Sequence, residues 1–172
     1  VLGNLEKMEI EKYIGNLFKD EKKVFVQDIM EKKDFQNKFL LNPRSTRVSI
    51  KIQDGCNNRC SYCIIPYARG NSRSNSEENI LEQIELVSKK GIKEIVLTGI
   101  HIGQWGLEFN KTLLDLLKEI EKSSIHRFRL GSLYANEIDD EMIEFLANSK
   151  KFCPHFHLSL QSLCDKTLKN MN

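Results

Sequence analysis

Four segments of this chain have a pattern of apolar and polar residues that predicts a β-strand, and they begin at Arg47, Glu94, Arg127 and Phe156. In the first, Val48, Ile50 and Ile52 alternate with polar neighbours, which is the two-residue period of a strand with one buried face. The second, EIVLT, is short and mostly apolar, which is typical of a parallel strand buried on both faces. It ends at Gly99.

Between these strands, apolar residues recur every three or four positions, which predicts amphipathic helices. The three sets are Ile80, Leu81, Ile84 and Val87; Leu113, Leu116, Leu117 and Ile120; and Ile138, Met142, Phe145 and Leu146. Two pairs fit a capping box at a helix start, Ser74 with Glu77 and Thr112 with Asp115. Gly91 is expected to end the first helix, and a fourth helix is expected to begin near Asp165.

Alternation of strands and helices predicts an α/β fold with parallel strands and right-handed crossovers, either a barrel or an open sheet. In such folds the active site lies at the carboxyl ends of the strands. That rule brings four segments to one surface: the cysteine-rich loop after the first strand and residues 99–104, 132–135 and 161–162.

The first 40 residues have a different character. Five apolar residues suggest a short amphipathic helix: Leu5, Met8, Tyr13, Ile14 and Leu17. The later run KVFVQDI fits a strand or an extended linker. Neither segment has the pattern of a barrel unit, so we expect a boundary between residues 1–40 and 41–172.

Composition favours a globular protein with one domain and an appendage, since the chain has 172 residues and 40% hydrophobic content. No apolar run has membrane-spanning length, and the first ten residues, VLGNLEKMEI, are charged where a signal peptide would be apolar. Five cysteines are an odd number and do not suit a secreted disulfide framework. A cytoplasmic location is expected.

Charge is unevenly distributed, although the net charge is only +2. Residues 41–75 carry one acidic residue, Asp54, against six basic ones: Arg44, Arg47, Lys51, Arg59, Arg69 and Arg73. This basic pole suits an anionic partner such as RNA, and a solvated surface explains it about as well.

The segment DGCNNRCSYCIIPYARG holds Cys56, Cys60 and Cys63 with three and then two residues between them. Three thiolates in one short loop can hold a [4Fe-4S] cluster and leave one iron free to coordinate a small molecule. Zinc is the alternative, but a structural zinc site needs four ligands. The remaining cysteines, Cys153 and Cys164, and all four histidines lie far downstream.

The CxxxCxxC spacing with Tyr62 before the last cysteine resembles the radical S-adenosylmethionine (SAM) enzymes. Further blocks resemble the methylthiotransferases of that class: IKIQDGCNNRCSYCIIPYARG, EIVLTGIHIGQWG, RFRLGSLYANEI and HLSLQSLCDKTLKNMN. IIPYARG and GIHIGQWG are most similar to the branch that adds a methylthio group to carbon 2 of threonylcarbamoyladenosine in tRNA. The resemblance implies a partial radical SAM (β/α) barrel.

It also implies site residues and partners. Cys56, Cys60 and Cys63 would hold the cluster, and Tyr62 would pack near the adenine of SAM. Three further positions are implied to contact SAM: Gly99 near its amino group, with Ser132 and Gln161 near its carboxylate or ribose. An electron donor such as flavodoxin or ferredoxin and a tRNA substrate complete the set.

Other side chains have weaker functional readings. His101 could touch a ligand, whereas His155 and His157 read as ordinary groups beside the fourth strand. Arg69 and Arg73 could reach an RNA phosphate or the SAM carboxylate, although a loop arginine is often only solvated. Trp105 and Tyr134 could stack on a base, although isolated aromatics more often pack. Cys153 and Cys164 are expected to be structural.

Methylthiotransferases of the family that the chain resembles have three domains, and the chain is expected to be a fragment of such a protein. Residues 1–40 resemble the tail of an N-terminal domain that carries a second [4Fe-4S] cluster, and the RNA-binding β domain that follows the barrel is expected to be absent. The fragment alone is then expected to cleave SAM slowly at most and not to methylthiolate tRNA. Leu163 stands where the family commonly has glycine, which could strain or crowd the loop after the fourth strand.

Two alternatives stay open. Related enzymes perform the same chemistry on isopentenyladenosine in tRNA or on an aspartate of a ribosomal protein, so the substrate is not fixed by these motifs. A non-catalytic RNA-binding module stabilised by zinc is the alternative from a different functional class. Its metal content would distinguish it from an iron-sulfur enzyme.

Overall fold

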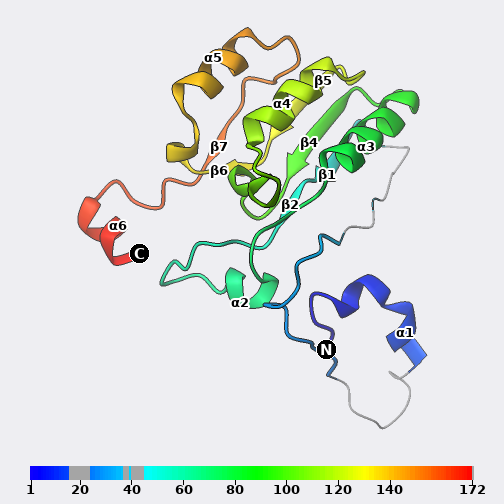
Figure 1. Cartoon of the computed structure of the whole chain (residues 1–172), viewed down its shortest axis with the longest axis vertical. Coiled ribbons are helices and arrows are strands. Elements are labelled where there is room, and N and C mark those ends of the chain that lie inside the picture. The colour runs from blue at the N-terminus through cyan, green and yellow to red at the C-terminus, as the bar shows by residue number, and fades with distance from the viewer. Residues whose placement is uncertain (16–23, 37–38, 40–44, 172) are drawn as a thin grey trace.

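A computed structural model describes residues 1–15, 24–36, 39 and 45–171 (Figure 1). Three parallel strands form the central sheet in the order β1 (Arg47–Lys51), β4 (Glu94–Thr98) and β5 (Arg127–Leu130). After Gly131, β6 (Ser132–Leu133) continues the direction of β5 and pairs in parallel with β7 (His157–Leu158). The predicted α/β fold with parallel strands is therefore confirmed, and the fourth strand is shorter than its sequence pattern suggests.

Strand register explains the core. Val48, Ile95 and Phe128 are aligned across the three strands, and the next inward row is Ile50, Leu97 and Leu130. All six are buried. Figure 1 shows two helices lying over the sheet, α3 (Glu77–Lys89) and α4 (Leu113–Lys122).

The opposite face of the sheet is less covered than the apolar run in β4 predicts. Ile95 and Leu97 are fully buried, whereas Val96 and Thr98 are only half-buried. In the part of the chain that the structure describes, helices thus seal one face of the sheet. The other face carries polar residues such as Ser49 and Arg129.

Helix ends test the two predicted capping boxes. Thr112 and Asp115 form one at the start of α4, as expected. The other prediction is wrong, because Ser76 caps α3 and accepts a hydrogen bond from the backbone N–H of Asn79 at 3.3 Å. Ser74 lies in a short strand instead, and its hydroxyl donates to Glu108 at 2.7 Å.

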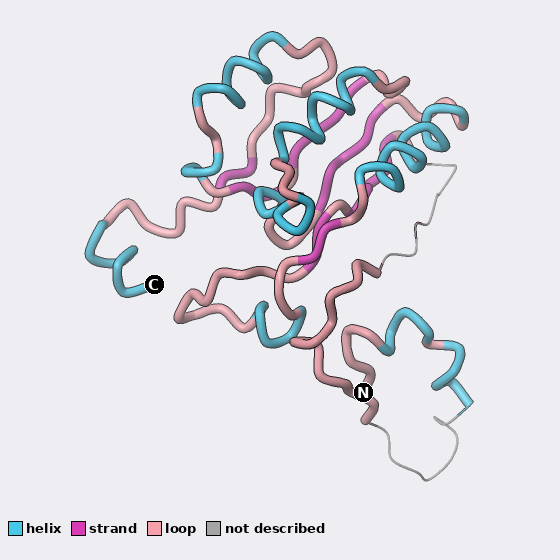
Figure 2. The backbone as a smooth tube through the Cα atoms, viewed as in Figure 1, coloured by secondary structure: helices cyan, strands magenta, loops and turns pink. Residues whose placement is uncertain are grey.

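Short elements at the carboxyl ends of the strands shape the loops there. They are β2 (Gln53–Asp54) paired antiparallel with β3 (Arg73–Ser74), the helix α2 (Ile65–Arg69), and the 3-10 turns η3 (Ile102–Gln104), η4 (Leu107–Phe109) and η5 (Ala135–Glu137). The last two helices are α5 (Asp140–Asn148) and α6 (Asp165–Met171). Figure 2 shows α6 at the end of a long loop that leaves β7. Ile138 precedes α5 and is not part of that helix.

The N-terminal segment forms two short turns, η1 (Glu6–Glu9) and α1 (Glu11–Ile14), where an amphipathic helix was expected. Leu17, Lys23 and Arg44 lie outside the described residues. Phe25 makes a single parallel bridge with Leu2, so the described part of KVFVQDI is extended without being a regular strand.

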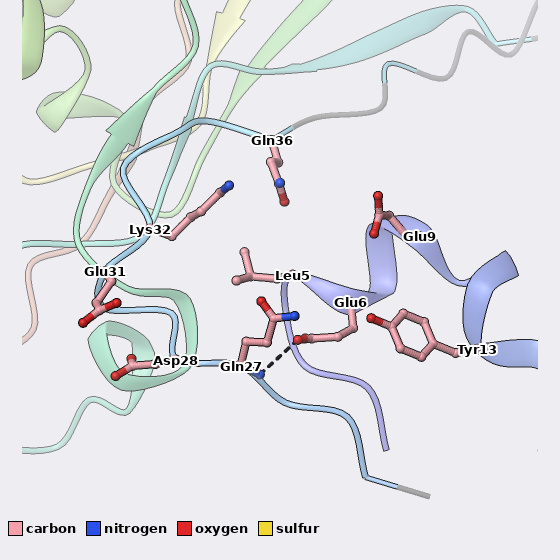
Figure 3. Close-up of a pocket in the computed structure, with 9 residues that line it drawn as sticks. All are labelled: Leu5, Glu6, Glu9, Tyr13, Gln27, Asp28, Glu31, Lys32 and Gln36. Carbon is pink, nitrogen blue, oxygen red and sulfur yellow. Dashed lines mark hydrogen bonds between the residues drawn. The ribbon is translucent and has the colours of Figure 1, made fainter. Parts of the chain in front are cut away.

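A cavity of about 270 Å³ lies between these turns and residues 27–36 (Figure 3). The carboxylate of Glu6, which is buried, accepts a hydrogen bond from the backbone N–H of Gln27 at 3.0 Å. This contact ties the first turn to the segment that leads toward the sheet. None of the helices in the described ranges has the length and apolar composition needed to cross a bilayer.

Candidate metal centre and cofactor pocket

The cysteine loop leaves β2 and is closed by two backbone features. Gly55 has φ +74°, and a Cβ there would lie 2.0 Å from the carbonyl oxygen of Asn71, so only glycine fits. The backbone N–H of Cys56 donates to the carbonyl of Gly70 at 3.1 Å. The sequence therefore returns on itself within 15 residues and presents the three cysteines on one tight loop.

All three cysteines in this loop carry free thiols. Cys56 is buried, whereas Cys60 and Cys63 are partly exposed, and a turn bond from Cys63 N–H to the Cys60 carbonyl measures 2.9 Å. The Arg59 guanidinium donates to the Cys56 carbonyl at 2.9 Å and to Asn71 at 2.6 Å. Arg59 therefore links the start of the loop at Cys56 to its end at Asn71 and stabilises its shape.

A cavity of about 560 Å³ lies where the strands end. Residues from all four strand-end segments line it, among them Cys60, Tyr62, His101, Tyr134, Gln161 and Met171. Its volume is in the range of pockets that enclose a ligand of cofactor size. The expected meeting of the four segments is thus present in the structure.

His101 is the most constrained polar group of this region. It is 4% exposed, its Nδ1 lies 3.5 Å from the Sγ of Cys56, and its Nε2 contacts the carboxylate of Glu137. Burial opposes protonation of the imidazole, but hydrogen bonds with Cys56 and Glu137 outweigh it and raise the pKa of His101 to about 9. Burial likewise opposes ionisation of Cys56, and the contact with His101 prevails and lowers the pKa of the thiol.

Tyr62 and Gln161 line the cavity, as their predicted roles require. Burial and the neighbouring Cys60 raise the pKa of Tyr62 to about 12, so its phenol stays protonated. Gln161 has φ +59°, which is unusual for a residue with a side chain. Leu163 does not have a positive φ, and it is 92% exposed. The backbone strain and crowding expected at Leu163 are therefore absent.

Gly99 and Ser132 lie beside the cavity without lining it. A Cβ at Gly99 would come within 2.9 Å of the Gln53 carbonyl oxygen, which gives this glycine a packing reason. The hydroxyl of Ser132 lies 3.3 Å from Nδ1 of His157, on the paired strand β7. Contacts of either residue with SAM stay predictions.

The basic pole is partly neutralised within the protein. Asp54, which is 4% exposed, is paired with Lys51 at 2.7 Å, Arg69 at 3.3 Å and Arg73 at 3.6 Å. Burial opposes the charge of this carboxyl, but the hydrogen bond from Lys51 and the nearby Arg69 outweigh it and lower the pKa of Asp54. Arg73 is itself buried, so a contact between Arg73 and RNA phosphate is not supported.

Trp105 is a packing residue, as an isolated aromatic more often is. It is fully buried, and its Nε1–H donates to the carbonyl of Asn75 at 2.8 Å. Cys153 is buried, in line with a structural role. The same expectation is wrong for Cys164, which is exposed at the start of α6.

Sequence reasoning missed Glu137 and Gly103. Both stand next to His101 because the loops after β4 and β6 lie side by side, and a Cβ on Gly103 would meet the Glu137 carboxylate at 2.3 Å. The available signal was an acidic residue four positions after the third predicted strand, RFRLGSL, at the edge where the site was expected.

The donor set fits an iron-sulfur cluster better than a single zinc ion. A tetrahedral zinc site with Zn–S bonds of about 2.3 Å draws its ligands close together. Among the described residues, no three His, Cys, Asp or Glu side chains are grouped so that they could hold one metal ion. A [4Fe-4S] cluster binds each thiolate at a different iron, so its thiolates stand farther apart than the ligands of a single zinc ion.

A partial barrel of parallel strands, with a loop of three free thiols that reaches its strand-end cavity through Cys60, defines a protein that can hold a metal cluster and a small ligand. The radical SAM superfamily model matches residues 50–172, and the chain belongs to that superfamily. SAM and a [4Fe-4S] cluster are the cofactors of this superfamily, as the resemblance of the cysteine loop implies.

Similar proteins include the threonylcarbamoyladenosine tRNA methylthiotransferase of Aquifex aeolicus, which is 40% identical over all of this chain and 43% of the relative. The tRNA-2-methylthio-N(6)-dimethylallyladenosine synthase of Dictyoglomus thermophilum is 34% identical over 99% of this chain and 39% of the relative. The chain thus spans about two-fifths of the length of these curated relatives.

A solved structure supports the fold. The radical SAM methyltransferase TsrM of Kitasatospora setae superposes with a TM-score of 0.59 at 21% identity, and the match covers 73% of this chain and 24% of that one. At that identity the likeness shows the architecture alone.

Proposed function

We propose that this chain is the cluster-binding part of a radical SAM methylthiotransferase that modifies carbon 2 of threonylcarbamoyladenosine in tRNA. The observation that carries the proposal is the loop of Cys56, Cys60 and Cys63, which reaches the strand-end cavity through Cys60. The similarity of the whole chain to the Aquifex aeolicus relative supports the choice of substrate.

The protein's own residues bind and orient the cofactors in this proposal. When bound, the reduced cluster and SAM supply a deoxyadenosyl radical. Cys56, Cys60 and Cys63 would hold three irons of the cluster. Tyr62 would cover the adenine of SAM, since this residue lines the cavity, is 54% exposed and can lose water contact there.

Three further residues are proposed to complete the binding of SAM. Gln161 would hold its carboxylate or ribose, because its amide stands on the cavity wall. Gly99 and Ser132 would act at the strand ends beside it. The reducing electron would come from a small donor protein such as flavodoxin or ferredoxin, in the cytoplasm.

Residues 1–40 are proposed to belong to a preceding domain and residues 41–172 to the barrel. Within the described residues, the two parts touch at several points, among them the hydrogen bond between Arg69 and Asn4 at 2.5 Å and the packing of Phe39 against the core. A second [4Fe-4S] cluster would reside in the preceding domain.

Metal analysis after anaerobic purification tests the proposal. Iron and sulfide in a brown protein are expected, and stoichiometric zinc in a colourless one would instead support a zinc-stabilised RNA-binding module. Addition of SAM to the reduced protein should then change the paramagnetic resonance spectrum of the cluster. The related nucleoside without the amino acid portion should not, because it lacks the nitrogen and oxygen donors for the open iron.

The substrate needs its own experiment. The longer protein that contains this chain is incubated with reductant, SAM, sulfide and tRNA that carries either threonylcarbamoyladenosine or isopentenyladenosine. Mass spectrometry of the nucleosides should show a methylthio product only from the first. Product only from the second, or only on a ribosomal protein, would reassign the substrate within the same class of enzyme.

A further inference from the structure

His101 is clamped between two acceptors. Its Nδ1 lies 3.5 Å from the Sγ of Cys56, across 45 residues of sequence, and its Nε2 contacts Glu137, which lies 36 residues downstream. The imidazole is almost entirely buried at the cavity wall. Both contacts are polar, so they hold the ring in one orientation rather than only filling space.

Several groups fix the orientation of the imidazole ring. The backbone N–H of His101 donates to Gln53 at 2.8 Å, and the ring of Tyr134 packs edge-on with centroids 4.6 Å apart. The Glu137 carboxylate is held from its other oxygen by the backbone N–H of Tyr134 at 2.8 Å. Gly103 has no side chain, which leaves room for the Glu137 carboxylate beside His101.

The direction of the Cys56 contact follows from hydrogen-bond inventory. A thiolate that ligates iron carries no proton, so the ring nitrogen must be the donor and the sulfur the acceptor. The carboxylate on the opposite side is also an acceptor, so it orients the ring through the second N–H. In sites where histidine is itself the metal ligand, a carboxylate on the far ring nitrogen orients the imidazole, and Glu137 stands in that place behind His101.

We propose that His101 is a positioning residue that donates a hydrogen bond to the cluster ligand Cys56 and that Glu137 holds it in place. The inference rests on the proposed function, because it needs the cluster. A hydrogen bond to a ligand sulfur stabilises the extra negative charge of the reduced cluster and raises its reduction potential. His101 therefore helps to decide how readily the cluster accepts an electron.

The test is a potentiometric titration of the reconstituted protein, followed by paramagnetic resonance. His101→Phe keeps a ring against Tyr134 but removes the donor, and its midpoint potential should move to more negative values. His101→Gln restores an N–H donor and should return most of that shift. Glu137→Ala should move the potential in the same direction as His101→Phe, but less. The matched control is His126→Phe, since His126 is exposed at the amino end of β5.

Equal potentials in the wild type and in His101→Phe would overturn the inference. The same holds for His101→Gln shifted as far as His101→Phe, which would indicate a role of the ring in packing alone. If His101→Phe does not fold, as judged by circular dichroism, the comparison of Glu137→Ala with the wild type decides the question, and an unchanged potential there refutes the inference. A wild-type protein that assembles no cluster would instead contradict the proposed function itself.

Discussion

The two ends of the parallel sheet each hold a glutamate with basic partners, but the two groups are built in different ways. Glu94 at the amino end is buried, and Glu137 at the carboxyl end is partly buried. At the amino end, Glu94 accepts from Arg127 at 2.5 Å and from Arg129 at 2.8 Å, with Arg47 at 3.8 Å. At the carboxyl end, Glu137 contacts His101, which contacts Cys56.

Strand register builds the first of these groups, with Arg129 two residues beyond Arg127 on β5. Arg47, Glu94 and Arg127 occupy one row across β1, β4 and β5, so neighbouring strands present the charges to one another. The second group comes from three loops, each with its own glycine or turn to shape it. The comparison indicates that the amino end of the sheet serves stability. At the carboxyl end, loops rather than strand register position the reactive groups.

The largest expected effect concerns the thiols at the carboxyl end. Cys60→Ala should abolish retention of the cluster, because two remaining thiolates leave a second iron without a protein ligand. Cys56→Ala and Cys63→Ala should behave alike. Iron and sulfide are measured after anaerobic reconstitution, with Cys153→Ala and Cys164→Ala as controls that keep the cluster. Full iron content in Cys60→Ala would remove the thiol loop from consideration as the metal centre.

Trp105 tests whether loops at the carboxyl end also contribute to stability. Trp105→Ala should lower the free energy of unfolding by about 3–5 kcal/mol, because it empties a fully buried site. Trp105→Phe should cost less, since it keeps most of the apolar contact and loses the hydrogen bond to Asn75. Urea denaturation measures both. A loss below about 1 kcal/mol in the alanine variant, which is the effect of an ordinary substitution, would show that this loop is not part of the stable core.

Glu94 tests the amino end. Hydrogen bonds from Arg129 and Arg127 outweigh burial and hold the pKa of Glu94 below its ordinary value of 4.5. A lowered pKa in the folded state means that the carboxylate stabilises the protein above pH 4.5, and that this contribution is lost as the pH falls through the lowered value. Glu94→Gln should therefore cost about 1–3 kcal/mol at neutral pH, since charged hydrogen bonds are lost.

The same variant should also lose less stability than the wild type on acidification below pH 4.5, as urea denaturation at several pH values would show. Glu85→Gln is the control, because Glu85 pairs with Lys89 on the exposed side of α3 and should show no measurable effect. If both variants behave alike, the arginine row contributes no more than a surface ion pair.

The smallest expected effect is at Leu163. Its side chain is 92% exposed and its φ is not positive, so Leu163→Gly should change the free energy of unfolding by no more than about 0.5 kcal/mol. A stabilisation well above that value would mean that leucine strains the loop. The measurement is a urea titration of the variant beside the wild type.

The fold could largely be predicted from apolar spacing, because the strands and helices that it indicates bury those residues. Gly91, with φ +76°, follows α3 as expected. The capping box of Ser74 failed for a physical reason: the hydroxyl has a stronger partner in Glu108, which lies 34 residues downstream. Local spacing cannot reveal such a competitor.

The candidate site could be predicted in part. The rule that active sites lie at the carboxyl ends of parallel strands located the cavity and the cysteine loop. It could not predict the contact between His101 and Glu137. The neutralisation of Lys51, Arg69 and Arg73 by Asp54 was equally hidden, because a count of charges along the chain does not show which of them meet in space.

One backbone contact bears on how the thiol loop forms. The N–H of Ser61, between Cys60 and Tyr62, donates to the carbonyl of Met171 at 3.0 Å, and the Ser61 hydroxyl donates to the Asn170 carbonyl at 3.2 Å, 109 residues away. Contacts of such long range form late in folding, because the entropy of closing a large loop must be overcome first. The loop that carries the cysteines therefore reaches its final shape only when α6 docks, and amide hydrogen exchange at Ser61 reports directly on that docking.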